Sequence, residues 1–173
     1  YLIPNSLDEY RDFHDSSWFK KFFTLIDGTI LHDIGDHFGG NLYSATRVFM
    51  LPWMLVESLY NYNIGIFNRS DVYDRNDIWN QFKQLNSFNA ALGKTSENCY
   101  VAMYCSYEDY ILQSIKITRN EDKLRVTDRD FNNKLTSVTG EKIASRCWNN
   151  NNFALSKDIR HCVVHNGGRP TEA

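Results

Sequence analysis

The chain has 173 residues, of which 42% are hydrophobic, 14% aromatic and 23% charged. This composition predicts a single globular domain over 1–173 and argues against a disordered chain, because burial of aromatic side chains offsets the entropy of ordering. The longest apolar runs, such as 48–56, fall far short of the roughly 20 residues that span a bilayer. We therefore expect a soluble protein with no membrane partner.

Charge and cysteine content narrow the class further. The chain carries 19 basic and 21 acidic residues, a balance that argues against a broad surface for polyanions. The distribution is uneven, because residues 1–40 carry three basic and seven acidic side chains, whereas 141–169 carry five basic and two acidic. The four cysteines form no C-x-x-C pair, which predicts reduced thiols and a cytoplasmic protein.

Apolar residues at three- and four-residue steps predict helices through the first half of the chain. A capping box at 6–9 predicts a helix start, and 18–34 is expected to form one helical stripe that ends at Gly39 and Gly40. Asn41 is expected to cap the next helix, in which Pro52 introduces a kink or a break.

A third predicted helix begins at Asp77 and ends at Gly93, and Ser96 is expected to open a fourth that runs through Ile115. The stretch 115–126 alternates apolar and polar residues around a polar centre. That pattern fits a small β-hairpin as well as a frayed helix end, and the sequence favours neither.

The C-terminal part predicts three shorter helices. Asp128 is expected to cap one that stops at Gly140, and 141–148 is expected to form another. The last would run over 153–166, with Ile159, Cys162 and Val163 on its apolar side. The whole pattern predicts an all-α fold, a helical bundle of about seven helices.

The densest cluster of reactive side chains lies at 157–168. In the structural interpretation, Arg160 makes a surface ion pair and His165 interacts with the last carbonyls of its helix. In the functional interpretation, Arg160 holds a phosphate while His165 moves a proton, as phosphodiester cleavage requires. The two residues lie about 7.5 Å apart along the helix axis and roughly 140° around it. One helix alone would make a loose site, in which the long arginine must reach sideways, whereas two such helices meeting across a symmetric dimer could bring both arginines and both histidines into one cleft.

Two metal-binding alternatives are weaker. His161 and His165 are four residues apart and Asp158 lies one turn earlier, but no glutamate follows His161 and Arg160 would repel a cation. The segment 32–37 also pairs histidines with aspartates at four-residue spacing, which solvated helix charge explains adequately. The sequence contains no G-x-G-x-x-G, P-loop or G-x-S-x-G motif, so we expect neither a cofactor nor a resident metal.

Arginine, a polar residue, a short spacer and histidine on the final helix resemble the signature of the HEPN superfamily. Arg160 matches the arginine, His161 the polar position and His165 the histidine, within a segment that continues to Gly167 and Gly168. The preceding segments 107–112 and 128–131 are similar to those of HEPN-type proteins from prokaryotic defence and toxin–antitoxin systems. The resemblance covers roughly residues 95–168.

The resemblance implies a homodimeric, metal-independent endoribonuclease that leaves a 2′,3′-cyclic phosphate, acting as a toxin or defence effector with a cognate antitoxin or regulatory protein. His165 would be the general base or acid, Arg160 would stabilise the phosphate and His161 would assist. We expect Lys157, Asn166 and Arg169 to contact RNA. The alternatives are a non-catalytic HEPN-like module that dimerises and binds RNA, a nucleotide or a protein, and a purely structural helical domain.

Overall fold

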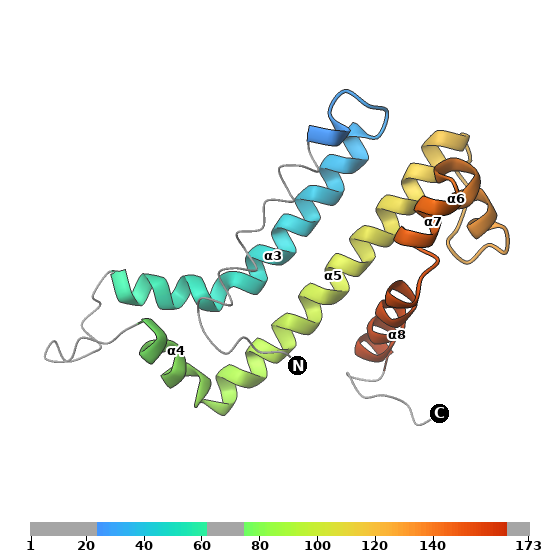
Figure 1. Cartoon of the computed structure of the whole chain (residues 1–173). Coiled ribbons are helices and arrows are strands. Elements are labelled where there is room, and N and C mark those ends of the chain that lie inside the picture. Colours follow the sequence, from blue (N-terminus) through green and yellow to red (C-terminus); the bar gives the residue numbers. More distant parts are fainter. Residues whose placement is uncertain (1–23, 62–74, 166–173) are drawn as a thin grey trace, which may run out of the picture. The chain divides into compact units, whose positions relative to one another are not determined.

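The computed structural model describes residues 24–61 and 75–165, and its regular structure is entirely helical over these ranges (Figure 1). The helices are α3 (His32–Asn61), α4 (Arg75–Lys83), α5 (Asn86–Arg119), α6 (Phe131–Thr139), α7 (Glu141–Cys147) and α8 (Asn151–His165). The all-α prediction is confirmed. None of the helices in these ranges combines the length and the apolar character needed to span a membrane.

The described residues divide into two compact units. Residues 43–61 and 75–99 form the first unit, and residues 24–42 and 100–165 form the second. Helices α3 and α5 each contribute to both units. The cluster of reactive residues predicted from the sequence lies on α8, in the second unit.

The start of α3 differs from the predicted stripe over 18–34. Residues 24–26 are helical, but 27–31 form a turn, in which Gly28 has a φ of +69° that favours glycine. The turn folds Ile26 back onto α3, and a Cβ at Gly35 would collide with the Ile26 side chain. The predicted helix start at 6–9 and the part of the stripe over 18–23 lie outside the described residues.

The predicted stop at Gly39 and Gly40 is wrong, and so is the cap at Asn41, because α3 continues through all three residues. Phe38 and Leu42 are buried on either side of the glycines, so packing outweighs the roughly 1 kcal/mol that glycine costs in a helix. Pro52 lies inside α3 and does not end it. The ribbon of α3 bends in its C-terminal half, where a proline removes one helical hydrogen bond (Figure 1).

The boundary between α4 and α5 lies at residues 84–85, not at Gly93 as predicted. Asn89 donates a side-chain hydrogen bond of 2.5 Å to the carbonyl of Lys83, the last residue of α4, and so satisfies a group that the helix end exposes. Gly93 lies inside α5. Ser96 does not open a helix either, because its hydroxyl donates to the carbonyl of Leu92 one turn earlier, at 2.8 Å.

The first unit packs around a core of large apolar side chains from α3, α4 and α5. Its buried members are Met50, Val56, Ile78, Trp79 and Leu92, with Phe49, Trp53, Phe82 and Phe88 partly buried around them. The rings of Trp79 and Phe88 meet edge to face at 5.7 Å. An ion pair of 2.8 Å between Arg75 and Glu57 joins α4 to the end of α3.

The hairpin alternative at 115–126 is wrong, because α5 continues to Arg119. Asn120 has a φ of +55°, and its N–H bonds the carbonyl of Ile117 at 3.4 Å. The N–H of Glu121 bonds the carbonyl of Lys116 at 3.0 Å. These two bonds around a left-handed residue form the Schellman motif, which ends a helix without forming a strand.

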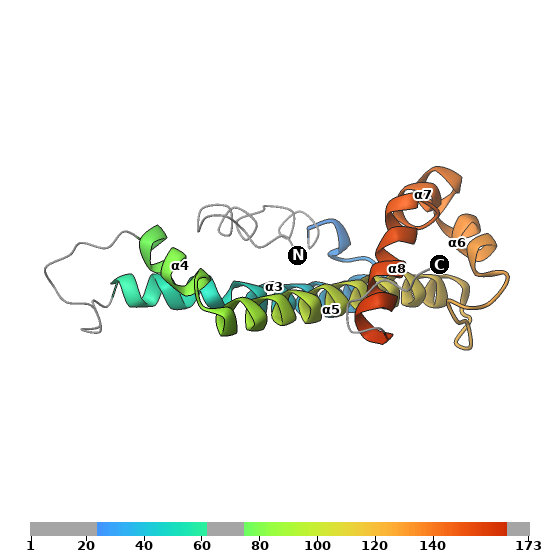
Figure 2. The ribbon, with the colours of Figure 1, turned by 90° about the horizontal axis from the view of Figure 1, so that it is seen from below.

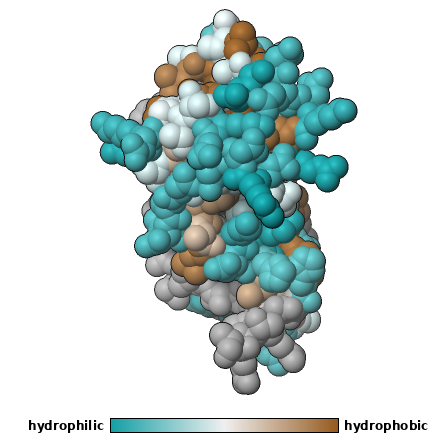
Figure 3. All heavy atoms as spheres, turned by 90° about the vertical axis from the view of Figure 1, so that its right-hand side faces the viewer, coloured by the Kyte–Doolittle hydropathy of each residue, from teal (hydrophilic) through white to brown (hydrophobic). Residues whose placement is uncertain are grey.

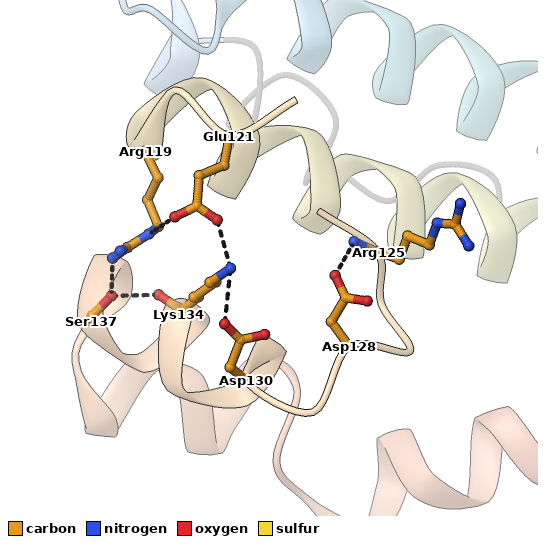
Figure 4. A network of polar contacts seen from close by, with 7 residues as sticks. All are labelled: Arg119, Glu121, Arg125, Asp128, Asp130, Lys134 and Ser137. Carbon is orange, nitrogen blue, oxygen red and sulfur yellow. Dashed lines mark hydrogen bonds and ion pairs between the residues drawn. The ribbon is translucent and has the colours of Figure 1, made fainter. Parts of the chain in front are cut away.

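A network of charged side chains fixes the turn that follows α5 (Figure 4). Glu121 contacts Arg119 at 2.9 Å and Lys134 at 2.6 Å, and Lys134 also contacts Asp130 at 2.9 Å. Hydrogen bonds from Lys134 and then Arg119 lower the pKa of Glu121. Asp128 accepts from the N–H of Arg125 at 2.8 Å, so its side chain closes this turn and does not cap α6 as predicted.

The second unit has its own core, built from the C-terminal half of α5, from the turn that follows it and from α6 and α7. The buried members are Ile111, Ile115, Leu124, Phe131, Leu135 and Ala144. The predicted short helices before and after Gly140 are confirmed as α6 and α7. Figures 1 and 2 both show α8 beside α5, on the side to which α6 and α7 also pack.

Shortening a side chain of this core tests its contribution to stability. Leu135 is 1% exposed, so Leu135→Ala leaves a cavity, and we expect the free energy of unfolding to fall by about 2–5 kcal/mol in urea denaturation. The matched change Leu25→Ala removes the same atoms from a side chain that is 78% exposed. It should change stability by less than about 0.5 kcal/mol, and equal losses in the two variants would contradict the described packing.

Candidate functional site

Helix α8 runs over Asn151–His165, close to the predicted span, and its start is fixed by Asn150. The Asn150 side-chain oxygen accepts a hydrogen bond of 2.8 Å from the N–H of Phe153, the interaction expected of an N-cap residue. The Asn150 side-chain amide also donates to the carbonyl of Arg146 at 2.8 Å. One side chain therefore links the end of α7 to the beginning of α8.

Three tyrosines on one face of α5, which we call the tyrosine ladder (Tyr100, Tyr104 and Tyr107), contact α8 and the end of α7. Tyr100 donates its hydroxyl to the carbonyl of Ser156 at 2.9 Å, and Tyr107 donates to the carbonyl of Cys147 at 2.7 Å. The ring of Tyr104 stacks on Phe153 with centroids 5.5 Å apart and planes 16° apart. One hydrogen bond and a stacked pair thus join α5 to α8, and the bond from Tyr107 joins α5 to the last residue of α7.

The side chain of Arg160 also packs against the tyrosine ladder. The guanidinium carbon of Arg160 lies 6.0 Å from the centroid of the Tyr104 ring, within range of a cation–π interaction. Two donors of this pair, the Arg160 Nε–H and the Tyr104 hydroxyl, are buried and have no hydrogen-bond partner among the described residues. The side chain of Arg160 therefore faces α5 while remaining partly exposed.

The Tyr104 hydroxyl keeps its proton at any physiological pH. Burial, followed by the negative charge of Glu108 one turn along α5, raises the pKa of Tyr104 to about 12, against the opposing charge of Arg160. Burial likewise raises the pKa of Tyr107. Both hydroxyls are thus hydrogen-bond donors at neutral pH.

The two histidines lie on a different part of α8. His161 and His165 are exposed, and their ring centroids are 4.6 Å apart. Lys157 is also exposed. Asn166 and Arg169, the other predicted RNA contacts, lie outside the described residues.

In the structure, therefore, the ring of His161 contacts the ring of His165, and the guanidinium of Arg160 contacts the ring of Tyr104. Among the described residues, no hydrogen bond or ion pair links Arg160 to either histidine. Arg160 and His165 are separated by roughly 140° around the axis of α8, so in one copy they point in different directions. The contacts of α8 in a single copy therefore do not bring the two groups together.

The side of α8 predicted to be apolar is not buried, because Cys162 and Val163 are half-buried and Ile159 is exposed. Ile159 was predicted on the apolar side facing the core, but it is 41% exposed, and Leu155 one turn before it is 59% exposed. Phe153 and Arg160 occupy the side toward α5 instead. In Figure 3, hydrophilic residues cover most of the face that carries α6–α8, and apolar residues form small separate patches.

The tyrosine ladder was missed as part of the site. The spacing of four and three residues was visible in the sequence, but it indicates only a helix face and does not say which helix it meets. Two cavities of the second unit, of about 160 and 380 Å³, are lined by residues of α3 and α5 and by residues 121–134. Neither of these two cavities is lined by a residue of α8.

The histidine and aspartate cluster at 32–37 forms local charge contacts. His32 lies 3.5 Å from Asp36 and 3.7 Å from Asp27, all at least partly exposed. Within the described residues, no group of three or more histidine, cysteine, aspartate or glutamate side chains is placed to hold a metal ion. All four cysteines are free thiols.

Comparison with models of known families, with curated proteins and with solved structures finds no match to this chain.

The raised pKa of Tyr104 predicts how stability changes in alkaline solution. Between about pH 10 and pH 12 the unfolded chain loses this proton while the folded chain keeps it, so the free energy of unfolding should fall as the pH rises. In Tyr104→Phe the free energy of unfolding should fall less steeply over this pH range. It should change little at pH 7, because the hydroxyl of Tyr104 has no partner among the described residues. Urea denaturation at several pH values measures both slopes, and equal slopes would contradict the assignment.

Proposed function

We propose that the protein is a metal-independent endoribonuclease that acts as a homodimer through Arg160, His165 and His161. The resemblance of this helix to the HEPN signature supports the proposal, as does the positive charge of the C-terminal segment. The same resemblance suggests a toxin or defence effector that a cognate antitoxin or regulatory protein controls.

One observation carries the proposal. Within the described residues, no carboxylate pairs with Arg160, and neither His161 nor His165 makes a salt bridge. A purely structural role predicts an ion pair for a half-buried arginine, because an unpaired buried charge is unfavourable. Arg160 instead rests on the ring of Tyr104, which leaves its charge available to a phosphate.

The chemistry needs only these groups and the RNA. One histidine accepts the proton of the 2′-hydroxyl as that oxygen bonds to phosphorus, and the bond from phosphorus to the 5′-oxygen breaks. A second histidine of the dimer protonates the leaving 5′-oxygen. Arg160 stabilises the extra negative charge on the phosphate in the transition state. The products are a 2′,3′-cyclic phosphate and a 5′-hydroxyl end.

The proposed dimer resolves the separation of Arg160 from His165. No residue of α8 is buried, and Leu155 and Ile159 expose apolar surface on the side away from the tyrosine ladder. Pairing of this surface in two copies would remove it from water and bring the histidines of one copy toward the arginine of the other.

The alternative is a non-catalytic module that dimerises and binds RNA, a nucleotide or a protein. The rotation of α8 favours it, because a phosphate held by Arg160 on the ladder side of one copy would not reach His165 of the same copy. The two functions differ in whether the phosphodiester bond is broken.

Cleavage of single-stranded RNA in the presence of EDTA tests the proposed function. The wild-type protein should produce 2′,3′-cyclic phosphate ends, and His165→Ala should slow cleavage by about 10²–10⁴-fold, the usual contribution of a general acid or base. A substrate with one 2′-deoxy residue should remain intact at that position.

The matched control is His37→Ala, which removes an exposed histidine on α3 and should cleave at the wild-type rate. A wild-type protein that binds RNA without cutting it at any concentration favours the non-catalytic module. Equal rates for wild type and His165→Ala would show that the activity lies elsewhere.

Introducing charge on the exposed face of α8 tests the dimer. Ile159→Asp should convert the dimer to a monomer in analytical ultracentrifugation and abolish cleavage with it, because two carboxylates would be buried in the interface. Leu25→Asp places the same charge on another exposed leucine and should leave both properties unchanged. A monomeric wild-type protein that cleaves RNA would contradict the composite site.

A further inference from the structure

His161 and His165 form a pair whose geometry suits a metal ion. The rings lie one helical turn apart with centroids separated by 4.6 Å and planes inclined at 45°. Both are exposed, and within the described residues neither ring donates or accepts a hydrogen bond. Both rings are therefore accessible to a metal ion from solvent.

We infer that His161 and His165 together bind a divalent transition-metal ion such as Zn²⁺, and that its binding switches the RNA-cleaving site off. The second part rests on the proposed function, whereas the first does not. The rest of the coordination shell would be water, because the described residues provide no third ligand.

The distance between the rings supports shared coordination. A Zn–N bond of about 2.0–2.1 Å and a ring centre roughly 1.2 Å behind the nitrogen place each centroid about 3.2 Å from the metal. Two neighbouring ligands at 90–110° around the ion then have centroids roughly 4.5–5.2 Å apart. The separation of 4.6 Å falls in this range without a change of backbone.

The charges around the pair also permit a cation. The sequence argument against a metal was repulsion by Arg160, but this guanidinium lies over Tyr104, on the side of α8 that faces α5. The exposed carboxylate of Asp158 lies one turn before His161 on the same side as the ring pair. It offsets the exposed ammonium of Lys157, which also lies one turn before His161.

Metal binding and catalysis would compete for the same atoms. A histidine that coordinates a metal cannot use that nitrogen to accept or donate a proton. A bound Zn²⁺ would also occupy the space in which His165 meets the RNA. Zinc would therefore be an inhibitor of an enzyme that needs no metal.

Titration of Zn²⁺ into the full-length protein, in competition with a chromogenic chelator, tests the site directly. Wild type should bind the ion, and His161→Ala and His165→Ala should each weaken binding by about tenfold or more, because each removes one of two ligands. His37→Ala should bind like wild type. Mg²⁺ should not compete, whereas Ni²⁺ and Cu²⁺ should, as imidazole ligands predict. Equal affinity in all four proteins would overturn the site.

A second measurement tests the metal site in the wild-type protein alone, so it does not depend on whether the variants fold. The chain has five histidines, and Zn²⁺ added to wild type should shift the NMR signals of two imidazole rings only, those of His161 and His165. Shifts confined to other histidines would overturn the inference.

The inhibitory part is measured in the cleavage assay without chelator. Zn²⁺ should inhibit wild type at the concentrations at which it binds. When each rate is expressed relative to the same protein without Zn²⁺, half inhibition of His161→Ala should require about tenfold more Zn²⁺ than half inhibition of wild type. Binding without inhibition would support the metal site and overturn its proposed role as an inhibitory switch. A wild-type protein that never cleaves RNA refutes the proposed function, while the titration alone decides the metal site.

Discussion

The candidate site depends on the attachment of α8 to the tyrosine ladder of α5. Tyr100 donates to the carbonyl of Ser156 within α8, Tyr107 donates to the carbonyl of Cys147 at the end of α7, and Tyr104 stacks on Phe153. Backbone carbonyls are fixed by the helix itself, so these contacts set the rotation of α8 more firmly than contacts with flexible side chains would. That rotation turns Arg160 toward α5 and leaves both histidines in solvent.

The same rotation separates two kinds of chemistry on one short helix. The permanent charge of Arg160 lies on an aromatic face with buried donors that lack partners, an environment suited to holding an anion. The two rings of the histidine pair are exposed to solvent and lie 4.6 Å apart, an arrangement suited to a metal ion. RNA cleavage requires both groups at one phosphate, which is why the proposed function requires a second copy. The proposed metal binding requires only one copy of the chain.

The sequence predicted the fold class and the approximate span of α8 from helical periodicity, and it predicted the short helices α6 and α7 from their division at Gly140. The helix ends predicted at Gly39, Gly40 and Gly93 are wrong because all three lie inside helices, whereas the end predicted at Gly140 is confirmed. Glycine costs a helix only about 1 kcal/mol, which packing of neighbouring residues readily outweighs. The sequence also identified the reactive residues of α8 by their types and spacing. It could not predict that Arg160 faces inward and Ile159 outward, because helix rotation is set by tertiary partners such as Tyr104.

The central claim is that Arg160 of one copy acts with His165 of another, and complementation between two inactive variants tests it most directly. Arg160→Ala and His165→Ala should each cleave RNA poorly. When mixed under conditions that allow subunits to exchange, they should regain cleavage, because a mixed dimer contains one intact arginine and one intact histidine in different copies. A mixture that forms mixed dimers but remains as inactive as its separate components would contradict the claim.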